Sequence, residues 1–216
     1  AWMRTPYIGT EEYGISSMKD EEVEKALVKA LNDHQQLLAH CNGDRAAQQL
    51  LSMADKVNRP EELKAIRPVI IHGQLLGIDQ LPEVKRLGFI PSFFIAHVYH
   101  WGDIHIENFG LSRASQISPA NSALKEKILF TFHQDSPVIK PDMLETVWCA
   151  SNRLTKKGIL LGEEEIIPVK EALKAVTINA AYQYGEEETK GSLTNGKKAD
   201  LVILDQNPLE VDKKDL

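Results

Sequence analysis

Residues 128–138 read Ile-Leu-Phe-Thr-Phe-His-Gln-Asp-Ser-Pro-Val, an apolar and β-branched run that ends in a histidine, an aspartate and a proline. A short run of this kind, bounded by a breaker, is typical of a buried β-strand. His133 and Asp135 are two residues apart, so on an extended chain their side chains point to the same side. Parallel α/β folds place their chemistry where strands end. A structural interpretation also stays open, in which Asp135 caps the next helix and His133 is a hydrogen-bonded loop residue.

Three earlier segments repeat the pattern of a strand that ends in a histidine. They are residues 36–39 before His40, residues 68–71 before His72, and residues 89–96 before His97. Helical sequence lies between or beside them at residues 45–57, 78–87 and 123–126, with an irregular stretch expected over residues 99–122. Strands that alternate with helices indicate βαβ units and a parallel sheet. Four such strands predict half of a (β/α)8 barrel, with an open sheet of four or five strands as the alternative.

The character of the sequence changes near its end. Further helical sequence covers residues 141–154 and 163–184, and residues 191–198 are then rich in turn formers, including Asn195-Gly196. Residues 199–205, Ala-Asp-Leu-Val-Ile-Leu-Asp, predict a strand. We therefore expect a hairpin or the edge of a second, all-β unit in this tail.

Composition narrows the class of protein. The chain has 216 residues, of which 43% are hydrophobic and 26% charged, with a net charge of -6, so nothing basic favours nucleic acid or an anionic membrane. The apolar runs are too short to cross a bilayer, and the start has no signal-peptide pattern. Cys41 and Cys149 form no disulfide or CxxC pattern, which predicts free thiols in the cytoplasm. The chain lacks an initiator methionine, and we expect it to be cut from a longer polypeptide.

The strand ends supply a candidate metal site. His40, His72 and Asp135 together offer two imidazoles and a carboxylate, which suit zinc or a similar divalent ion. A divalent ion lowers the pKa of its water, and a nearby carboxylate can take that proton and pass it to a leaving group. The set therefore predicts hydrolysis at a carbonyl or a similar carbon.

The other histidines allow more than one role. His97 lies beside Tyr99, His100 and Trp101, a cluster that fits either substrate contact or a hydrogen-bonded aromatic plug in a loop. We expect His133 to contact substrate as well, because it shares a side with Asp135. His105 is predicted to be a surface residue.

Several of these segments resemble one known family. The segment 40–46, His-Cys-Asn-Gly-Asp-Arg-Ala, resembles the strand-five motif of the amidohydrolase superfamily, in the branch that includes N-substituted formamide deformylase and exoenzyme regulatory proteins. Residues 71–74, Ile-His-Gly-Gln, are similar to its strand-six motif, and residues 133–138 to its strand-eight motif with an aspartate. Residues 190–202 are similar to the family's return into a small β-sandwich.

The resemblance implies a fold and a set of roles. It implies that residues 1–188 are the C-terminal half of a metal-dependent hydrolase barrel, strands five to eight, and that residues 189–216 belong to a composite β-sandwich domain. It assigns metal binding to His40 and His72, and metal binding with proton transfer to Asp135. His97 matches a strand-seven region with a less defined role.

The sequence also departs from the family. It contains no His-x-His pair and no strand-four ligand, so we expect a C-terminal portion that holds half a barrel and half a metal site and is inactive alone. The expected reaction of the longer protein is hydrolysis of an amide-type C–N bond in a small molecule, with one or two metal ions. The exposed strand edges would pair with the missing N-terminal half or with a second copy in a homodimer. The rival hypothesis is a regulatory or binding module that has lost catalysis.

Overall fold

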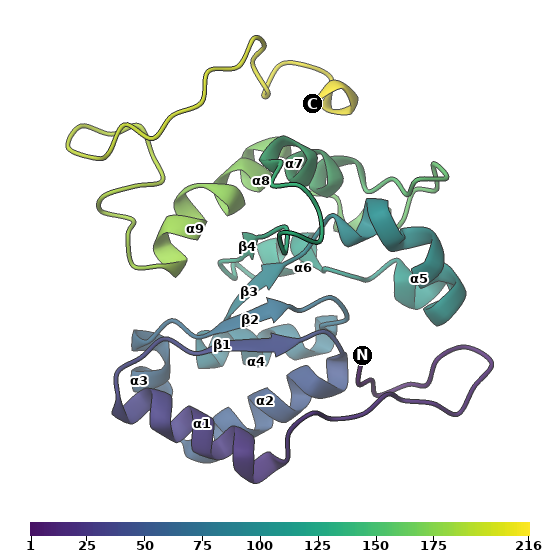
Figure 1. Ribbon diagram of the computed structural model, residues 1–216, viewed down its shortest axis with the longest axis vertical. Helices are drawn as coiled ribbons and strands as arrows, with labels where there is room; N and C mark the ends of the chain where they lie inside the picture. Colours follow the sequence, from purple (N-terminus) through teal and green to yellow (C-terminus); the bar gives the residue numbers. More distant parts are fainter.

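A four-stranded parallel sheet forms the centre of the computed structural model, which describes residues 1–216 (Figure 1). Its strands lie side by side in chain order: β1 (Leu38–Cys41), β2 (Val69–His72), β3 (Ile90–Phe93) and β4 (Thr131–Phe132). Cys41 pairs with His72, and His72 pairs with Phe93. The carboxyl ends of the strands therefore meet at one edge of the sheet. This confirms the predicted parallel α/β architecture.

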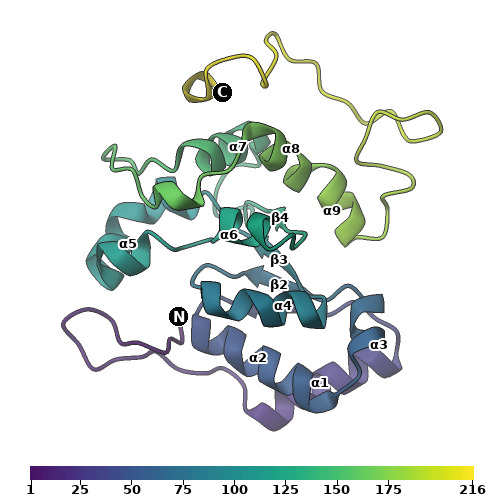
Figure 2. The same cartoon turned by 180° about the vertical axis from the view of Figure 1, so that it is seen from behind.

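Helices connect the strands and cover one face of the sheet. Those before β4 are α1 (Asp20–Asn32), α2 (Asp44–Val57), α3 (Pro60–Ala65), η1 (Ile78–Gln80), α4 (Leu81–Leu87), α5 (His97–Ala114) and α6 (Ala120–Lys125). Those after it are α7 (Met143–Asn152), η2 (Glu163–Glu165), α8 (Val169–Val176), α9 (Ile178–Gln183) and η3 (Lys213–Asp215). Helices α4 and α6 lie behind the sheet in Figure 1 and in front of it in Figure 2. Helices α8 and α9 pack beside β4.

The two inner strands are buried, whereas β1 is partly open. All four residues of β3 and three of the four in β2 are buried. In β1 only Cys41 is buried, and Leu38 keeps 51% of its surface exposed. The difference follows from position, because β1 has a strand neighbour on one side only.

The irregular stretch expected over residues 99–122 is wrong for most of its length, because α5 covers residues 97–114 with one non-helical residue, Gly110 (φ 76°). Ring-bearing side chains recur every four residues along α5, at His97, Trp101, His105 and Phe109. That spacing places them along one side of a helix, so the sequence could have predicted a helix here. Gly102 lies inside this helix, where a Cβ would stand 2.7 Å from the Thr155 Cγ2 atom.

The predicted strand at residues 199–205 is also wrong for this chain, which has no strand after β4. Val202 and Ile203 are 82% and 88% exposed, so the apolar run contacts little of the chain. A strand needs a partner backbone, and no ladder partner for this run is present here. The end of the tail is nevertheless held, because the indole Nε1 of Trp148 donates to the Lys214 carbonyl at 3.1 Å.

None of the helices combines the length and the apolar character that crossing a membrane requires.

Candidate metal centre

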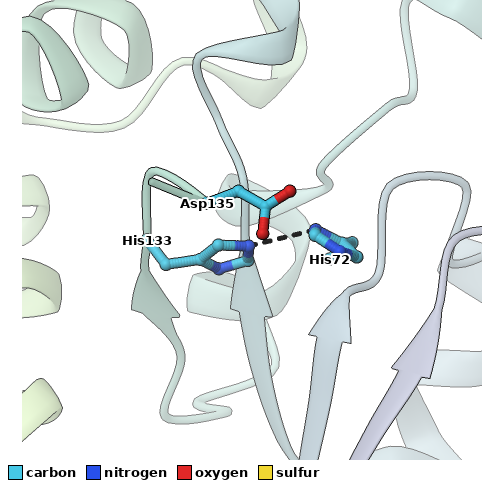
Figure 3. Close-up of side chains that lie close together, drawn as sticks. All are labelled: His72, His133 and Asp135. Atoms are coloured by element: carbon cyan, nitrogen blue, oxygen red, sulfur yellow. Dashed lines mark hydrogen bonds between the residues drawn. The ribbon is translucent and has the colours of Figure 1, made fainter. Parts of the chain in front are cut away.

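Three side chains converge at the carboxyl edge of the sheet. His72 ends β2, while His133 and Asp135 follow β4, and their candidate ligand atoms all lie within 4.8 Å of one another. The His133 Nε2 atom is 3.0 Å from the His72 Nδ1 atom. Figure 3 shows the Asp135 carboxylate directed toward the two imidazole rings. Two imidazoles and a carboxylate at this spacing form a donor set of the kind that holds a divalent cation.

Unusual backbone geometry presents two of these residues. His72 has a φ of 72° and Asp135 a φ of 51°, in the left-handed region that non-glycine residues rarely occupy. Such conformations persist where the surrounding fold imposes them, and they cluster at functional sites. His72 is the last residue of β2, and Asp135 lies three residues beyond the end of β4, so both unusual conformations stand at the carboxyl edge of the sheet.

A buried serine orients His133. The Ser92 hydroxyl on β3 is 2% exposed and lies 3.0 Å from the His133 Nδ1 atom. When Nδ1 donates its proton to Ser92, Nε2 is left with a lone pair directed at the other two side chains. Metal-binding histidines are held by this kind of outer hydrogen bond.

Burial keeps the two imidazoles of the cluster uncharged. Desolvation is the main cause that lowers the pKa of His133 to about 4, and nearby His72 lowers it further. Desolvation likewise lowers the pKa of His72, with a smaller effect from His40. A metal ligand must be unprotonated, so neutral imidazoles beside a carboxylate fit a cation.

Asp135 is not a helix cap. Helix α7 is capped by Asp142, whose side chain accepts from the backbone N–H groups of Leu144 and Glu145. Asp135 itself is exposed and its carboxylate makes no hydrogen bond with the protein. The structural interpretation left open for Asp135 is therefore wrong, and the carboxylate is free to act in the cluster.

His40 lies beside the cluster rather than inside it. Its ring is 4.7 Å from the His72 ring in an edge-to-face arrangement, on the open strand β1. The three-residue group is completed by His133, which the sequence interpretation assigned to substrate contact. Metal binding by His40 and substrate contact by His133 both stay predictions.

A second group of buried histidines adjoins the cluster across Phe94. The Phe94 ring lies 5.6 Å from the His133 ring and 4.7 Å from the His97 ring. His105, expected at the surface, is only 9% exposed, so that expectation is wrong. Its Nε2 atom lies 2.8 Å from the Gln74 Nε2 atom and 3.2 Å from the His97 Nδ1 atom.

Sequence reasoning missed Ser92, Gln74 and His105. Ser92 is a lone hydroxyl within the buried strand Ile90–Phe93, and that contrast was a usable signal. His105 required the four-residue spacing in α5 to be recognised first. The pairing of Gln74 with His105 joins two distant segments, so no local pattern could reveal it.

The two cysteines, Arg45 and His100 lie outside the three-residue group. Cys41 and Cys149 are free and buried, as predicted, and desolvation raises the pKa of the Cys41 thiol to about 12. The Arg45 guanidinium lies 4.9 Å from the centre of the Trp2 ring. The His100 Nε2 atom pairs with the Glu145 carboxylate at 2.7 Å, which joins α5 to α7.

Fold and site together define an α/β protein with a candidate divalent-metal centre at the carboxyl edge of its sheet. The chain belongs to the amidohydrolase family, whose model matches residues 1–216. N-substituted formamide deformylase of Arthrobacter pascens is 25% identical to it over 91% of this chain and 36% of that protein. The protein LONG AFTER FAR-RED 3 of Arabidopsis thaliana is 29% identical over 97% of this chain and 36% of that protein.

A solved structure shows the same fold. The crystal structure of an uncharacterized metal-dependent hydrolase from Pyrococcus horikoshii covers 99% of this chain with a TM-score of 0.84 and 27% identity. This chain corresponds to 43% of that structure. The chain thus spans about two fifths of the length of the relatives that it matches.

Proposed function

We propose that this chain is the C-terminal half, strands five to eight, of a (β/α)8 metal-dependent hydrolase that cleaves an amide-type C–N bond in a small molecule. The observation that carries the proposal is the convergence of His72, His133 and Asp135 at the carboxyl ends of β2 and β4. Membership of the amidohydrolase family and the metal-dependent hydrolase of the same fold support it.

His72, His133 and Asp135 would hold the metal, with His40 beside them as a further candidate ligand. A bound divalent cation, zinc being our first candidate, would polarise the scissile carbonyl and lower the pKa of a water molecule. Within the protein, Ser92 holds the His133 ring, and the turn at His72 presents that imidazole to the same point.

Asp135 would carry the proton. Its carboxylate is exposed at the edge of the sheet and free of protein hydrogen bonds, so it can accept a proton from the attacking water. It would then donate this proton to the leaving nitrogen as the C–N bond breaks. The carbonyl carbon gains the hydroxyl and the nitrogen gains the proton, which balances the hydrolysis. His97, across Phe94, would contact the substrate.

The proposal also divides the chain into two parts. Residues 1–188 would form half of the barrel, and residues 189–216 would contribute to a β-sandwich. The chain spans only 36% of the formamide deformylase, which supports its being part of a longer polypeptide. The open edge of β1 would pair with the preceding half of a longer polypeptide, and a homodimer is the competing arrangement. Alone, the chain would be inactive.

The test is a comparison of Asp135→Asn with the unsubstituted protein in a polypeptide that includes the preceding half. Turnover of a panel of N-substituted amides should fall about 10³-fold, with thermal unfolding unchanged because the side chain is exposed. Asp205→Asn, an exposed aspartate in the tail, is the matched control and should keep full activity. Equal turnover in Asp135→Asn would overturn the proposal. A protein that binds zinc yet hydrolyses no amide would favour a binding or regulatory module.

A further inference from the structure

A hydrogen-bonded chain of three side chains runs beside the candidate metal centre. The Gln74 Nε2 amide group lies 2.8 Å from the His105 Nε2 atom, which lies 3.2 Å from the His97 Nδ1 atom. Gln74 and His105 are 6% and 9% exposed. Gln74 comes from the turn after β2, and His97 and His105 come from α5, where they lie about two helical turns apart.

The chemistry of the amide and imidazole groups decides which of these three side chains donates and which accepts. An amide nitrogen can only donate, so His105 must accept at Nε2 and carry its own proton on Nδ1. A lone pair on the His97 Nδ1 atom would face the His105 lone pair at 3.2 Å and be repelled, so His97 carries its proton on Nδ1 and shares this acceptor with Gln74. The Nε2 atom of His97 is then left unprotonated.

Burial makes this assignment stable near neutral pH. Desolvation is the main cause that lowers the pKa of His105 to about 4 and that of His97 to about 3, so neither ring takes a second proton. The charges that bear on His97 are those of other histidines, His105 first, then His72, His133 and His100. Both rings therefore stay uncharged, and the hydrogen bonds alone decide which nitrogen of each ring carries the proton.

One ring nitrogen among these three side chains has no hydrogen-bond partner. The Nδ1 atom of His105 is buried and has no hydrogen-bond partner. An unpaired buried polar group costs about 1–3 kcal/mol, so the hydrogen bonds at the other ring nitrogen must offset that cost. The His105 side chain makes hydrogen bonds only through its Nε2 atom, which accepts from Gln74 and from His97.

The free Nε2 atom of His97 is available to a ligand. It makes no hydrogen bond with the protein and is not among the fully buried unpaired atoms. The His97 ring stands 4.7 Å from the Phe94 ring, and Phe94 in turn lies 5.6 Å from the His133 ring. A molecule bound at the candidate metal centre that extends across Phe94 would reach His97.

We propose that Gln74 and His105 are positioning residues that hold His97 in its Nδ1–H tautomer, so that its Nε2 atom accepts a hydrogen bond from substrate. This inference rests on the proposed function for its substrate. The inference also specifies the class of substrate. The part of the substrate that lies across Phe94 carries an N–H or O–H donor. A carboxylate at that point would face a lone pair and be rejected.

The first test reads the tautomers directly, with no substrate and no metal. In the chain labelled with ¹⁵N-histidine, imidazole nitrogen shifts should show His97 protonated at Nδ1. In Gln74→Glu the new carboxylate would accept from His105 Nε2–H, and His97 should switch to the Nε2–H tautomer. Gln80→Glu, a buried glutamine bonded to Gln48 on α2, is the matched control and should leave His97 unchanged. A wild-type His97 protonated at Nε2, or no switch in Gln74→Glu, would overturn the proposal.

A second pair of variants applies if Gln74→Glu fails to fold. In His105→Gln the amide oxygen can occupy the place of Nε2 and accept from His97, so the Nδ1–H tautomer should persist. In His105→Leu that acceptor is lost, and His97 should populate both tautomers. Identical His97 shifts in the two variants would reject the positioning role.

Chemical labelling gives an independent readout of the free nitrogen. Diethyl pyrocarbonate attacks an unprotonated imidazole nitrogen, so His97 should react at its accessible Nε2 in the wild type. The rate at His97, followed by peptide mass spectrometry, should fall about twofold in His105→Leu relative to His105→Gln, because part of the population then carries its proton on Nε2. Equal rates would contradict the proposal. Because neither readout uses amide hydrolysis, a failure of the proposed function and a failure of this inference are distinguishable.

Discussion

The His133 Nε2 atom lies 3.0 Å from the His72 Nδ1 atom, although 61 residues separate the two histidines in the chain. Two neutral imidazole nitrogens at this distance share one proton, with one ring donating and the other accepting. A cation held between them would replace that proton, because both nitrogens must then offer lone pairs. The contact is therefore the feature of the structure most directly linked to metal binding.

Ser92 should determine how tightly the centre binds a metal. Removing its hydroxyl in Ser92→Ala leaves the His133 Nδ1 proton without its partner, and the ring loses its fixed orientation. Loss of such an outer hydrogen bond weakens metal affinity by about 10–100-fold. Zinc titration by calorimetry on wild type and variant measures the change. Ser112→Ala, an exposed serine on α5, is the control, and equal affinity in all three proteins would contradict the assignment.

His105 should make stability depend on pH in mildly acidic solution. Its pKa is lowered by burial from 6.5 to about 4, so between these values the unfolded chain binds a proton that the folded chain does not. The free energy of unfolding therefore falls as pH decreases from about 6.5 to about 4, by up to about 3 kcal/mol at 1.36 kcal/mol per pH unit. Above pH 6.5 both states are neutral, and the effect vanishes.

Urea denaturation at pH 7.5, 5.5 and 4.5 with a chelator present measures this dependence. His105→Gln removes the titrating group, so its stability should decline less over the same interval. If the two proteins lose stability in parallel from pH 7.5 to 4.5, His105 is not responsible.

Arg153 should be a large contributor to folding stability. It is fully buried, and its guanidinium donates to the carbonyls of Leu161 at 2.8 Å and Ile117 at 2.9 Å. Arg153→Met leaves these carbonyls unpaired, at an expected cost of about 3 kcal/mol or more. Arg153→Lys should recover little of the lost stability, because one ammonium group cannot reproduce the several N–H donors of the planar guanidinium. In contrast, Arg86→Met, at an exposed ion pair, should cost less than about 1 kcal/mol in the same melts.

The apolar tail should become protected when the preceding half of the polypeptide is present. Val202 and Ile203 are exposed here, and their backbone has no ladder partner. Hydrogen exchange at residues 201–204 should be fast in this chain and at least tenfold slower in the longer polypeptide, because strand pairing protects amides. Equal exchange in the two would refute the proposed β-sandwich.

Particular residues show how far sequence reasoning reaches. The parallel sheet follows from apolar runs such as Val69-Ile70-Ile71, whose composition predicts a strand and whose first two residues are buried in β2. Helix α4 ends at Gly88, whose φ of 75° suits glycine, and the predicted helical segment 78–87 ends at the same place. The strand at residues 199–205 was misjudged, because a local pattern states a propensity while a strand also needs a partner.

The sequence by itself determined the class of fold, the family, and the strand ends at which polar side chains collect, since these depend on local periodicity and short motifs. Only the tertiary structure decided which of those side chains meet. It brought His133 rather than His40 into the group with His72 and Asp135, and it joined Gln74 to His105. The physical reason is that backbone turns such as those at His72 and Asp135 set side-chain direction, and that direction depends on the packing of segments far apart in the chain.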